Sequence, residues 1–148
     1  MADPVKALDG LIKLSRNAID SARRNLNAVE EQITAIEADD ARLLRELAAE
    51  KAAAGTDPAM IGGYVGYAGR VAKRRAEIGE HLSVLHRARD RALDDLAEAF
   101  RTVKRYELAR EARLARQAHE AAVRETDQLD EIGMNGFRRR RIEDGEGG

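Results

Sequence analysis

A chain of 148 residues is long enough for one ordinary domain, yet aromatic residues make up only 3% of it, while hydrophobic residues as a whole reach 43%. This composition is too poor in large side chains to fill a globular core, and with 36% charged residues and only two prolines it is typical of long helices or coiled coils. The 26 basic and 27 acidic side chains are mixed along the chain, so no net field favours nucleic acid or an anionic membrane.

The chain contains no cysteine, which excludes disulfides, thiolate nucleophiles and thiolate metal sites and suits a reducing compartment. Its first residues lead into an amphipathic pattern instead of the apolar core of a signal peptide. No window approaches the run of ~20 apolar residues that a membrane helix requires. We therefore expect a soluble, cytoplasmic protein.

The first predicted helix covers residues 4–54. Its apolar residues recur at steps of three and four from Val5 to Ala54, and the only polar residues at these positions are Ser15, Asp40 and Glu50. A pattern kept over so many heptads predicts a coiled-coil seam, the row of side chains that faces a partner helix, because the stripe of a solitary amphipathic helix would drift around its surface.

A corner is predicted at residues 55–58, Gly-Thr-Asp-Pro. Gly55 can end the first helix at its C-cap, Asp57 can cap the next helix, and Pro58 fits a first helical turn. The second helix is predicted over residues 59–133, with a slight change of phase near residue 92. Its expected seam consists of Tyr64, Ala68, Val71, Arg75, Ile78, Leu82, Leu85, Arg89, Leu93, Leu96, Phe100, Val103 and Tyr106.

The two seams match when the helices run antiparallel, with the numbers of facing residues adding to about 114 or 115. Apolar positions then face apolar positions, as in the pairing of Ile33 with Leu82. The same register sets Asp40 opposite Arg75, either as an ion pair that fixes the register or as two side chains that reach water separately. We predict one all-α unit over residues 1–148, a long antiparallel two-helix coiled-coil hairpin with a C-terminal helical overhang.

The first helix begins near Val5, opposite about Arg110, so the second helix is expected to overhang from about residue 111. Alanine makes up most of the apolar stripe of this overhang, and we expect a partner to order it. Residues 134–148 are expected to form a flexible tail. The arginine run 138–141 within it is either solvated or binds phosphates, and with Phe137 as the one aromatic residue beside it we expect no nucleic acid.

No residues with the pattern of a catalytic, cofactor or metal site are found. The histidines His81 and His86 are five apart, which keeps them off a common helix face, and His119 is remote in sequence. The glycines of residues 61–69 lack the strand and the Lys-Ser/Thr ending of a phosphate loop. These glycines either let the helices close tightly or belong to an exposed docking surface that includes Tyr67 and Val71.

Four short motifs, in this order, resemble those of the flagellar type III export protein FliJ family, which is related to the stalk proteins of virulence injectisomes. They are Ala-Leu-Asp-Gly-Leu-Ile-Lys-Leu at 7–14, Asp-Pro at 57–58 followed by Tyr-Val-Gly-Tyr at 64–67, Lys-Arg-Tyr-Glu-Leu at 104–108, and Gln-Leu-Asp-Glu-Ile at 128–132. The resemblance implies a non-enzymatic, cytoplasmic stalk and adaptor at the inner-membrane export apparatus, with the export ATPase FliI hexamer, the export gate protein FlhA and export chaperones as partners.

The resemblance also implies where two partners would bind. The open end of the hairpin, with Arg101, Lys104, Arg105, Arg110 and Arg113, would enter the ATPase pore. Tyr64, Tyr67, Val71 and Arg74 would contact the export gate, although Arg74 and Ile78 stand where the family is expected to have a small and a polar residue. The alternatives are an injectisome stalk and a structural coiled coil that dimerises through the overhang.

Overall fold

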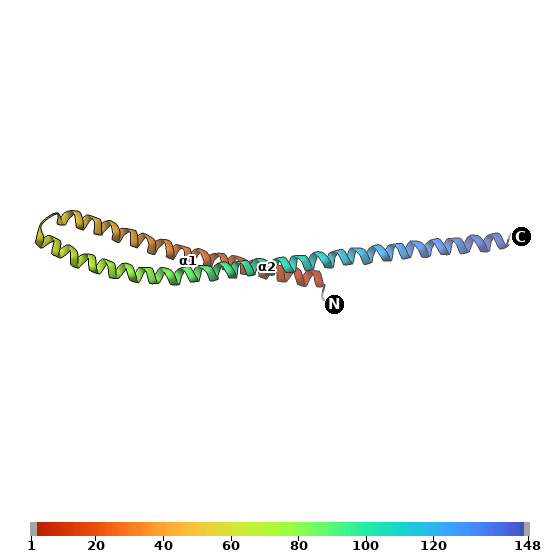
Figure 1. Cartoon of the computed structure of the whole chain (residues 1–148). Coiled ribbons are helices and arrows are strands. Elements are labelled where there is room, and N and C mark those ends of the chain that lie inside the picture. The colour runs from red at the N-terminus through yellow and green to blue at the C-terminus, as the bar shows by residue number, and fades with distance from the viewer. Residues whose placement is uncertain (1–2, 147–148) are drawn as a thin grey trace. The chain divides into compact units, whose positions relative to one another are not determined.

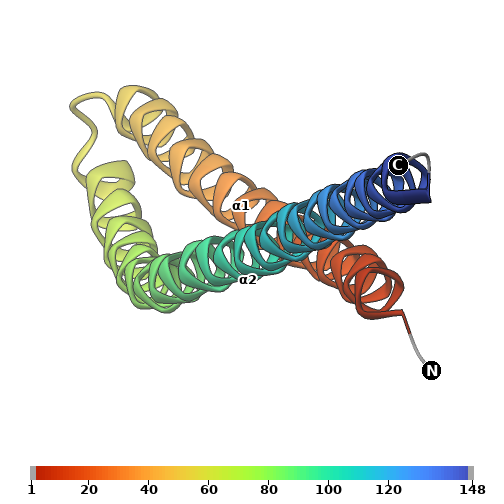
Figure 2. The same cartoon turned by 90° about the vertical axis from the view of Figure 1, so that its right-hand side faces the viewer.

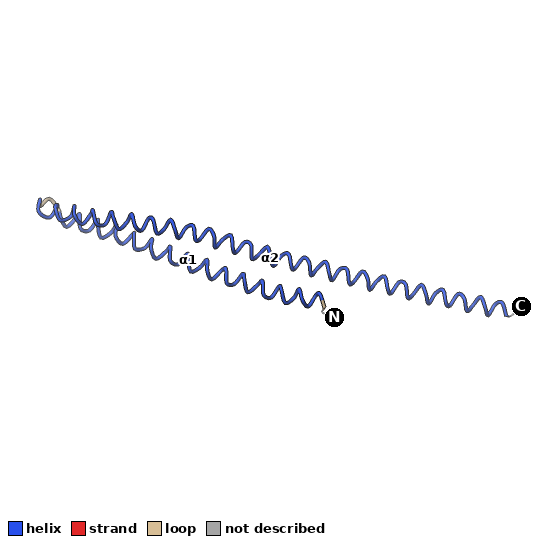
Figure 3. Tube along the Cα trace, turned by 90° about the horizontal axis from the view of Figure 1, so that it is seen from below, coloured by secondary structure: helices blue, strands red, loops and turns tan. Residues whose placement is uncertain are grey.

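The computed structural model describes residues 3–146 and contains two helices, α1 over Pro4–Ala54 and α2 over Pro58–Glu146 (Figure 1). The structure is 97% helical, and the described residues form no strand. Outside the helices, the trace is loop only at residue 3 and at the corner (Figure 3). The two helices pack against each other, which confirms the all-α hairpin.

Both helices begin at a proline that directly follows an N-capping aspartate. The carboxylate of Asp3 accepts a hydrogen bond from the Val5 N–H at 3.0 Å, and that of Asp57 accepts one from the Ala59 N–H at 3.0 Å. Each carboxylate thus satisfies a backbone donor that has no partner within the helix, and the proline that follows has no N–H to satisfy. The sequence therefore sets both helix starts locally.

The corner follows the expected chemistry. Gly55 adopts a positive φ of 55°, the left-handed conformation that ends a helix and that glycine reaches without a steric penalty. The chain then reverses and α2 begins at Pro58, one residue earlier than expected (Figure 2). The predicted roles of Gly55, Asp57 and Pro58 are all confirmed.

Contacts between residues divide the chain into two units, of which unit 2 spans Ser15–Arg101. In unit 2 the end of α1 packs antiparallel against the start of α2. Successive buried residues of α2 lie seven apart, as a heptad seam requires, and those of α1 also differ by multiples of seven. The buried residues are Ile19, Ile33 and Ala54 in α1, and Val71, Ile78, Leu85 and Ala92 in α2.

The phase change expected near residue 92 is wrong. The heptad of α2 continues without interruption, so Ala92 is buried, with 2% of its surface exposed, whereas Leu93 is 45% exposed. Phe100 is likewise exposed, and the half-buried Ala99 takes its expected place in the seam. Adjacent helical residues point about 100° apart, so the larger side chains lie beside the seam instead of in it.

Unit 1 combines the N-terminal residues up to Leu14 with the chain from Thr102 onward. Ile12 of α1 and Val103 of α2, which are expected to face each other, are both buried in this unit. Beyond residue 110, α2 continues past the start of α1 (Figure 1), and every described side chain from 111 to 145 is exposed except for the partly covered Gly136. The overhang is present, and its side chains are not covered by another helix of the described residues.

The overhang is longer than predicted. Helix α2 does not end at Gly133 but continues to Glu146, so the flexible tail expected from residue 134 is wrong for 134–146. Residues 147–148 lie outside the described residues. Each glycine in a helix costs about 1 kcal/mol relative to alanine, but no proline follows, and arginine is a good helix former. Gly133 and Gly136 therefore weaken the helix without ending it.

The core of this fold is narrow. None of the described residues has less than 2% of its surface exposed, because a pair of helices can cover each seam side chain from one direction only. Within residues 3–146, neither helix is apolar over a length that would span a lipid bilayer. Function in such a fold depends on exposed surfaces and on charged groups that the helix pair positions.

Candidate functional site

The structural register pair, Asp40 and Arg75, forms the bidentate ion pair that the seam pattern suggested. The Arg75 guanidinium donates from Nε to Asp40 Oδ1 at 2.8 Å and from Nη2 to Asp40 Oδ2 at 3.2 Å. These hydrogen bonds hold the pKa of Asp40 below its usual value and raise the pKa of Arg75. The alternative, in which the two side chains reach water separately, is wrong.

The corner surface, defined by the four residues assigned to the export gate, is only partly exposed. Tyr64 and Tyr67 are half-buried. Val71 is buried, with 4% of its surface exposed, because it occupies the seam heptad of α2. Arg74 is exposed and its guanidinium lies 3.5 Å from the Glu77 carboxylate, one turn along the same helix. The expectation of Val71 on an exposed docking surface is therefore wrong, since a partner would have to open the helix pair to reach it.

Exposed apolar side chains near the corner instead lie beside the seam. Met60, Ile61 and Val65 are all exposed, and Ile61 and Val65 lie one turn apart on a common face next to Tyr64. The seam pattern does not reveal them, because it selects only residues that face α1. Large apolar residues outside a seam are the sequence signal that would have identified them.

The glycines of this segment do not serve tight helix packing. A Cβ atom added at Gly62, Gly63 or Gly69 would meet nothing within 4 Å. At Gly66 it would meet only the end of the Arg70 side chain, at 3.8 Å. The prediction that small residues let the helices close tightly here is wrong, and the glycines leave a strip of exposed backbone at the start of α2.

The basic residues at the open end do not form one exposed face. Arg110 is half-buried, and its Nε donates to Asp9 Oδ1 at 2.5 Å, which joins the start of α1 to α2 in unit 1. Lys104, Arg105 and Arg113 are exposed, and Arg105 donates to the Thr102 hydroxyl at 3.2 Å. Lys104 and Arg113 thus present their charge to solvent in unit 1, Arg105 is exposed and bonds to its own helix, and Arg110 joins the two helices.

Arg101 belongs to unit 2. Its guanidinium lies 3.0 Å from the carboxylate of Glu98, three residues earlier on α2. This short-range ion pair offsets part of its charge, and because both side chains are well exposed it contributes little to stability. Arg101 is therefore a weaker candidate for binding an anionic partner than its sequence position suggested.

Among the described residues, the contacts of Arg23 with Phe100 and of Asp9 with Arg110 join the helices without following from the seam pattern. The Arg23 guanidinium lies over the Phe100 ring, 5.3 Å from its centre, which accounts for a large aromatic side chain beside the seam. The second is the ion pair of Asp9 with Arg110. In both, the residue numbers add to more than 115, because long side chains beside the seam reach past the residue directly opposite.

A family model described as the flagellar FliJ protein matches residues 5–141. The match includes all four motifs, the corner and most of the overhang. The comparisons with curated proteins and with solved structures found no match.

Proposed function

Because the chain belongs to the flagellar FliJ protein family, we propose that it is a stalk and adaptor that links the export ATPase to the export gate. The family is a non-enzymatic adaptor family of the flagellar export apparatus. The observation that carries the proposal is the extent of the family match, which covers nearly the whole of both helices. The proposed location is the cytoplasmic face of the inner membrane, reached through these partners alone.

The open end of the hairpin in unit 1 is the proposed contact with the export ATPase, FliI. Lys104, Arg105 and Arg113 present exposed positive charge, and the Asp9–Arg110 ion pair holds the start of α1 against α2. One helix pair can contact only some of the six subunits of a ring closely. Its binding therefore breaks the symmetry of the ring and biases ring assembly and ATP hydrolysis.

The test is to mix the purified chain with the export ATPase and to measure oligomerisation and ATP turnover. We expect both to increase, and reversal of Lys104, Arg105 and Arg113 to glutamate to abolish most of the increase through like-charge repulsion. Reversal of three exposed basic residues of unit 2, Lys51, Lys73 and Arg87, is the matched control. An ATPase unaffected by the wild-type chain would refute the stalk proposal.

The corner surface, without the buried Val71 and with the exposed Ile61 and Val65 added, is the proposed contact with the export gate, FlhA. The exposed Ile61 and Val65 extend the half-buried Tyr64 and Tyr67 into an apolar surface, and apolar and aromatic side chains are the usual anchors of an interface. A Val65→Glu substitution should weaken binding to the gate protein at least tenfold, roughly the value of one buried aliphatic side chain. Val84→Glu, at a similarly exposed position, is the control.

Escort of export chaperones is a third proposed role, and no surface of the chain is assigned to it. A chaperone that binds in competition with the gate protein would use the corner surface. A chaperone that binds the complex of chain and gate protein would use another one. Pull-down of a chaperone with wild-type chain and with Val65→Glu separates these outcomes.

A further inference from the structure

The overhang carries an apolar face that differs from the seam. If the heptad of Val103, Tyr106 and Arg110 continued, its next positions would be occupied by polar residues, namely Arg113, Gln117, Glu120, Arg124, Asp127 and Glu131. Leu129, Ile132 and Phe137 lie on another side of the helix, whereas Met134 takes the next position of that heptad. Leu129 and Phe137 are 62% and 63% exposed, and Ile132 and Met134 are exposed as well.

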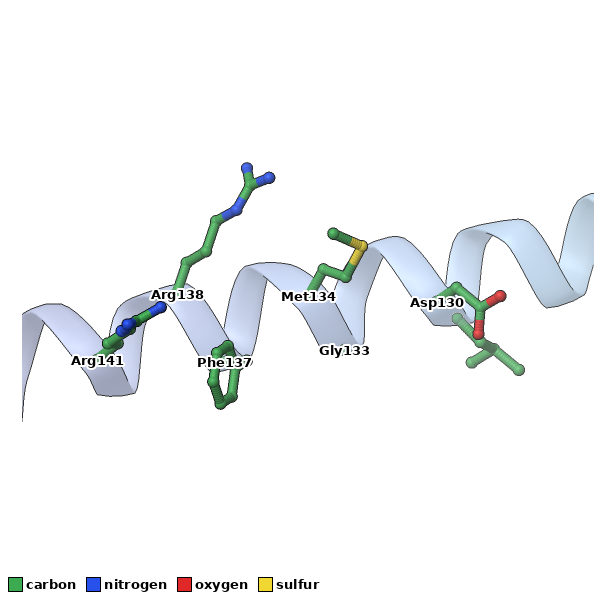
Figure 4. A pocket seen from close by; sticks show the side chains of 7 residues that line it. Asp130, Gly133, Met134, Phe137, Arg138 and Arg141 are labelled. Atoms are coloured by element: carbon green, nitrogen blue, oxygen red, sulfur yellow. The ribbon is translucent and has the colours of Figure 1, made fainter.

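Leu129, Gly133 and Phe137 succeed one another at intervals of one turn along this face. Together with Asp130, Met134, Arg138 and Arg141 they line a hollow, in which Gly133 lies at the floor (Figure 4). A Cβ atom added at Gly133 would meet nothing within 4 Å. Leu129 and Phe137 therefore project on either side of the gap at Gly133, and a side chain of an opposing helix can insert into this gap.

The charges along the same stretch are complementary to each other. Residues 120–131 contain five acidic side chains and one basic side chain, a net charge of −4. Residues 138–141 are four arginines, a charge of +4. A parallel pair of two such helices would set like charges side by side. An antiparallel pair centred near Ile132 and Gly133 sets each arginine run along the acidic segment of the other helix, which is attractive.

We infer that residues 120–144 of the overhang form a homodimerisation site at which two copies of this chain pair antiparallel. Ile132 of each copy then lies against Gly133 of the other, and Leu129 lies against Gly136. The paired stretch is about 37 Å long, which provides more than three heptads. This inference is independent of the proposed export function, because it requires no partner other than a second copy.

Sedimentation equilibrium of the full chain over a range of concentrations tests the inference. We expect a monomer–dimer equilibrium, and Leu129→Gln with Phe137→Gln should raise the dissociation constant at least tenfold, roughly the loss from one buried apolar side chain. Both side chains are exposed in the single chain, so the helix content should be unchanged by circular dichroism. The control, Val84→Gln, alters a comparably exposed residue outside the overhang and should leave the equilibrium unchanged.

Disulfide trapping tests the orientation, since the chain has no cysteine of its own. In an antiparallel pair centred near Ile132, residue 125 of one copy lies beside residue 139 of the other. A mixture of Glu125→Cys and Arg139→Cys chains should therefore form mainly the mixed disulfide under mild oxidation. Predominant crosslinking of Arg139→Cys with itself would overturn the antiparallel arrangement.

Two other outcomes would overturn the site itself. One is a chain that stays monomeric up to about 1 mM, where even a weak dimer is populated. The other is a dimer that persists unchanged in the Leu129→Gln, Phe137→Gln chain, which would place the interface elsewhere. If the chain is monomeric and the same substitutions abolish binding to the export ATPase, the face belongs to that partner and the inference is wrong.

Discussion

Asp40 and Arg75 are the charged residues that face each other across the seam of unit 2. Their two hydrogen bonds place complementary charges at one register of the helices only, since a shift by one heptad would set each charge opposite an apolar position. Their exposed fractions are 25% for Asp40 and 41% for Arg75, so solvent screens the attraction. We therefore expect the pair to specify register more than it contributes to stability.

The lowered pKa of Asp40 gives a pH dependence with a definite sign. The pKa of the folded state lies below the unfolded value of 3.8, so the ion pair stabilises the fold above pH 3.8, and this contribution is lost as the pH falls through the folded-state pKa. Asp40→Asn should therefore be less stable than wild type at about pH 7, and the difference should shrink at about pH 2. Urea unfolding of both proteins measures it, and a difference that grows on acidification would contradict the assignment.

Ala92 and Leu93 give a second prediction at this scale. Ala92→Leu should destabilise unit 2 by about 1–3 kcal/mol, because Ala92 is buried in the seam and a larger side chain forces the helices apart. Leu93→Ala should cost less than about 1 kcal/mol, because Leu93 is 45% exposed and loses little buried surface. Denaturant unfolding gives both values. A larger loss of stability for Leu93→Ala than for Ala92→Leu would mean that Leu93, and not Ala92, lies in the seam.

At the scale of the elements, short polar signals define the helix limits at the corner and at the start of α1. Asp3 and Asp57 cap the two starts, and Gly55 ends α1 with a positive φ. These devices act within a few residues and do not depend on the other helix. The end of α2 has no comparable stop signal, since Gly133 and Gly136 keep helical conformations.

Glycine substitutions should have opposite effects at the corner and inside a helix. Gly55→Ala should destabilise the hairpin by about 1 kcal/mol, because alanine has a steric penalty in the left-handed conformation. Gly79→Ala should stabilise it by about 1 kcal/mol, because Gly79 lies within α2 and an added Cβ meets nothing within 4 Å. Thermal unfolding measures both changes. Equal effects of the same sign at the two positions would show that the corner conformation is unstrained for alanine.

At the scale of the whole molecule, one chain supplies both partners of its coiled coil and also a helix without a partner. In unit 2, α1 and α2 cover each other's seam, whereas in unit 1 α2 continues beyond the start of α1 with its side chains exposed. Stability therefore resides in the paired stretches, and the unpaired stretch is the part whose apolar surface is available for binding.

The antiparallel pairing within one chain can be tested by a disulfide. Ile33 and Leu82 lie in unit 2 and have the same sum of residue numbers as the Asp40–Arg75 pair, so Ile33→Cys with Leu82→Cys should crosslink within a single chain on oxidation. The product should run as a monomer on a non-reducing gel. Crosslinks found only between chains would mean that the seams pair between two molecules.

The sequence by itself determined the two helices up to residue 133, the corner and the register of their pairing. A heptad repeat shows which face of a helix is buried, caps and glycine act locally, and the constant sum of facing residue numbers is enough to set Asp40 opposite Arg75. The family resemblance likewise follows from motifs in the sequence, and the match over residues 5–141 confirms it.

Only the tertiary structure decided which residues of a heptad are covered and which contacts reach beyond it. Ala92 and Leu93 are both apolar, so the sequence pattern does not show which of them lies in the seam. The heptad of α2 is uninterrupted in the structure, and it is Ala92 that is buried. Val71 is also buried in the seam and therefore does not belong to the candidate docking surface. Arg110 is paired with Asp9 and therefore does not belong to the exposed basic face. Periodicity gives the direction of a side chain around its helix, whereas exposure depends on how closely the second helix approaches.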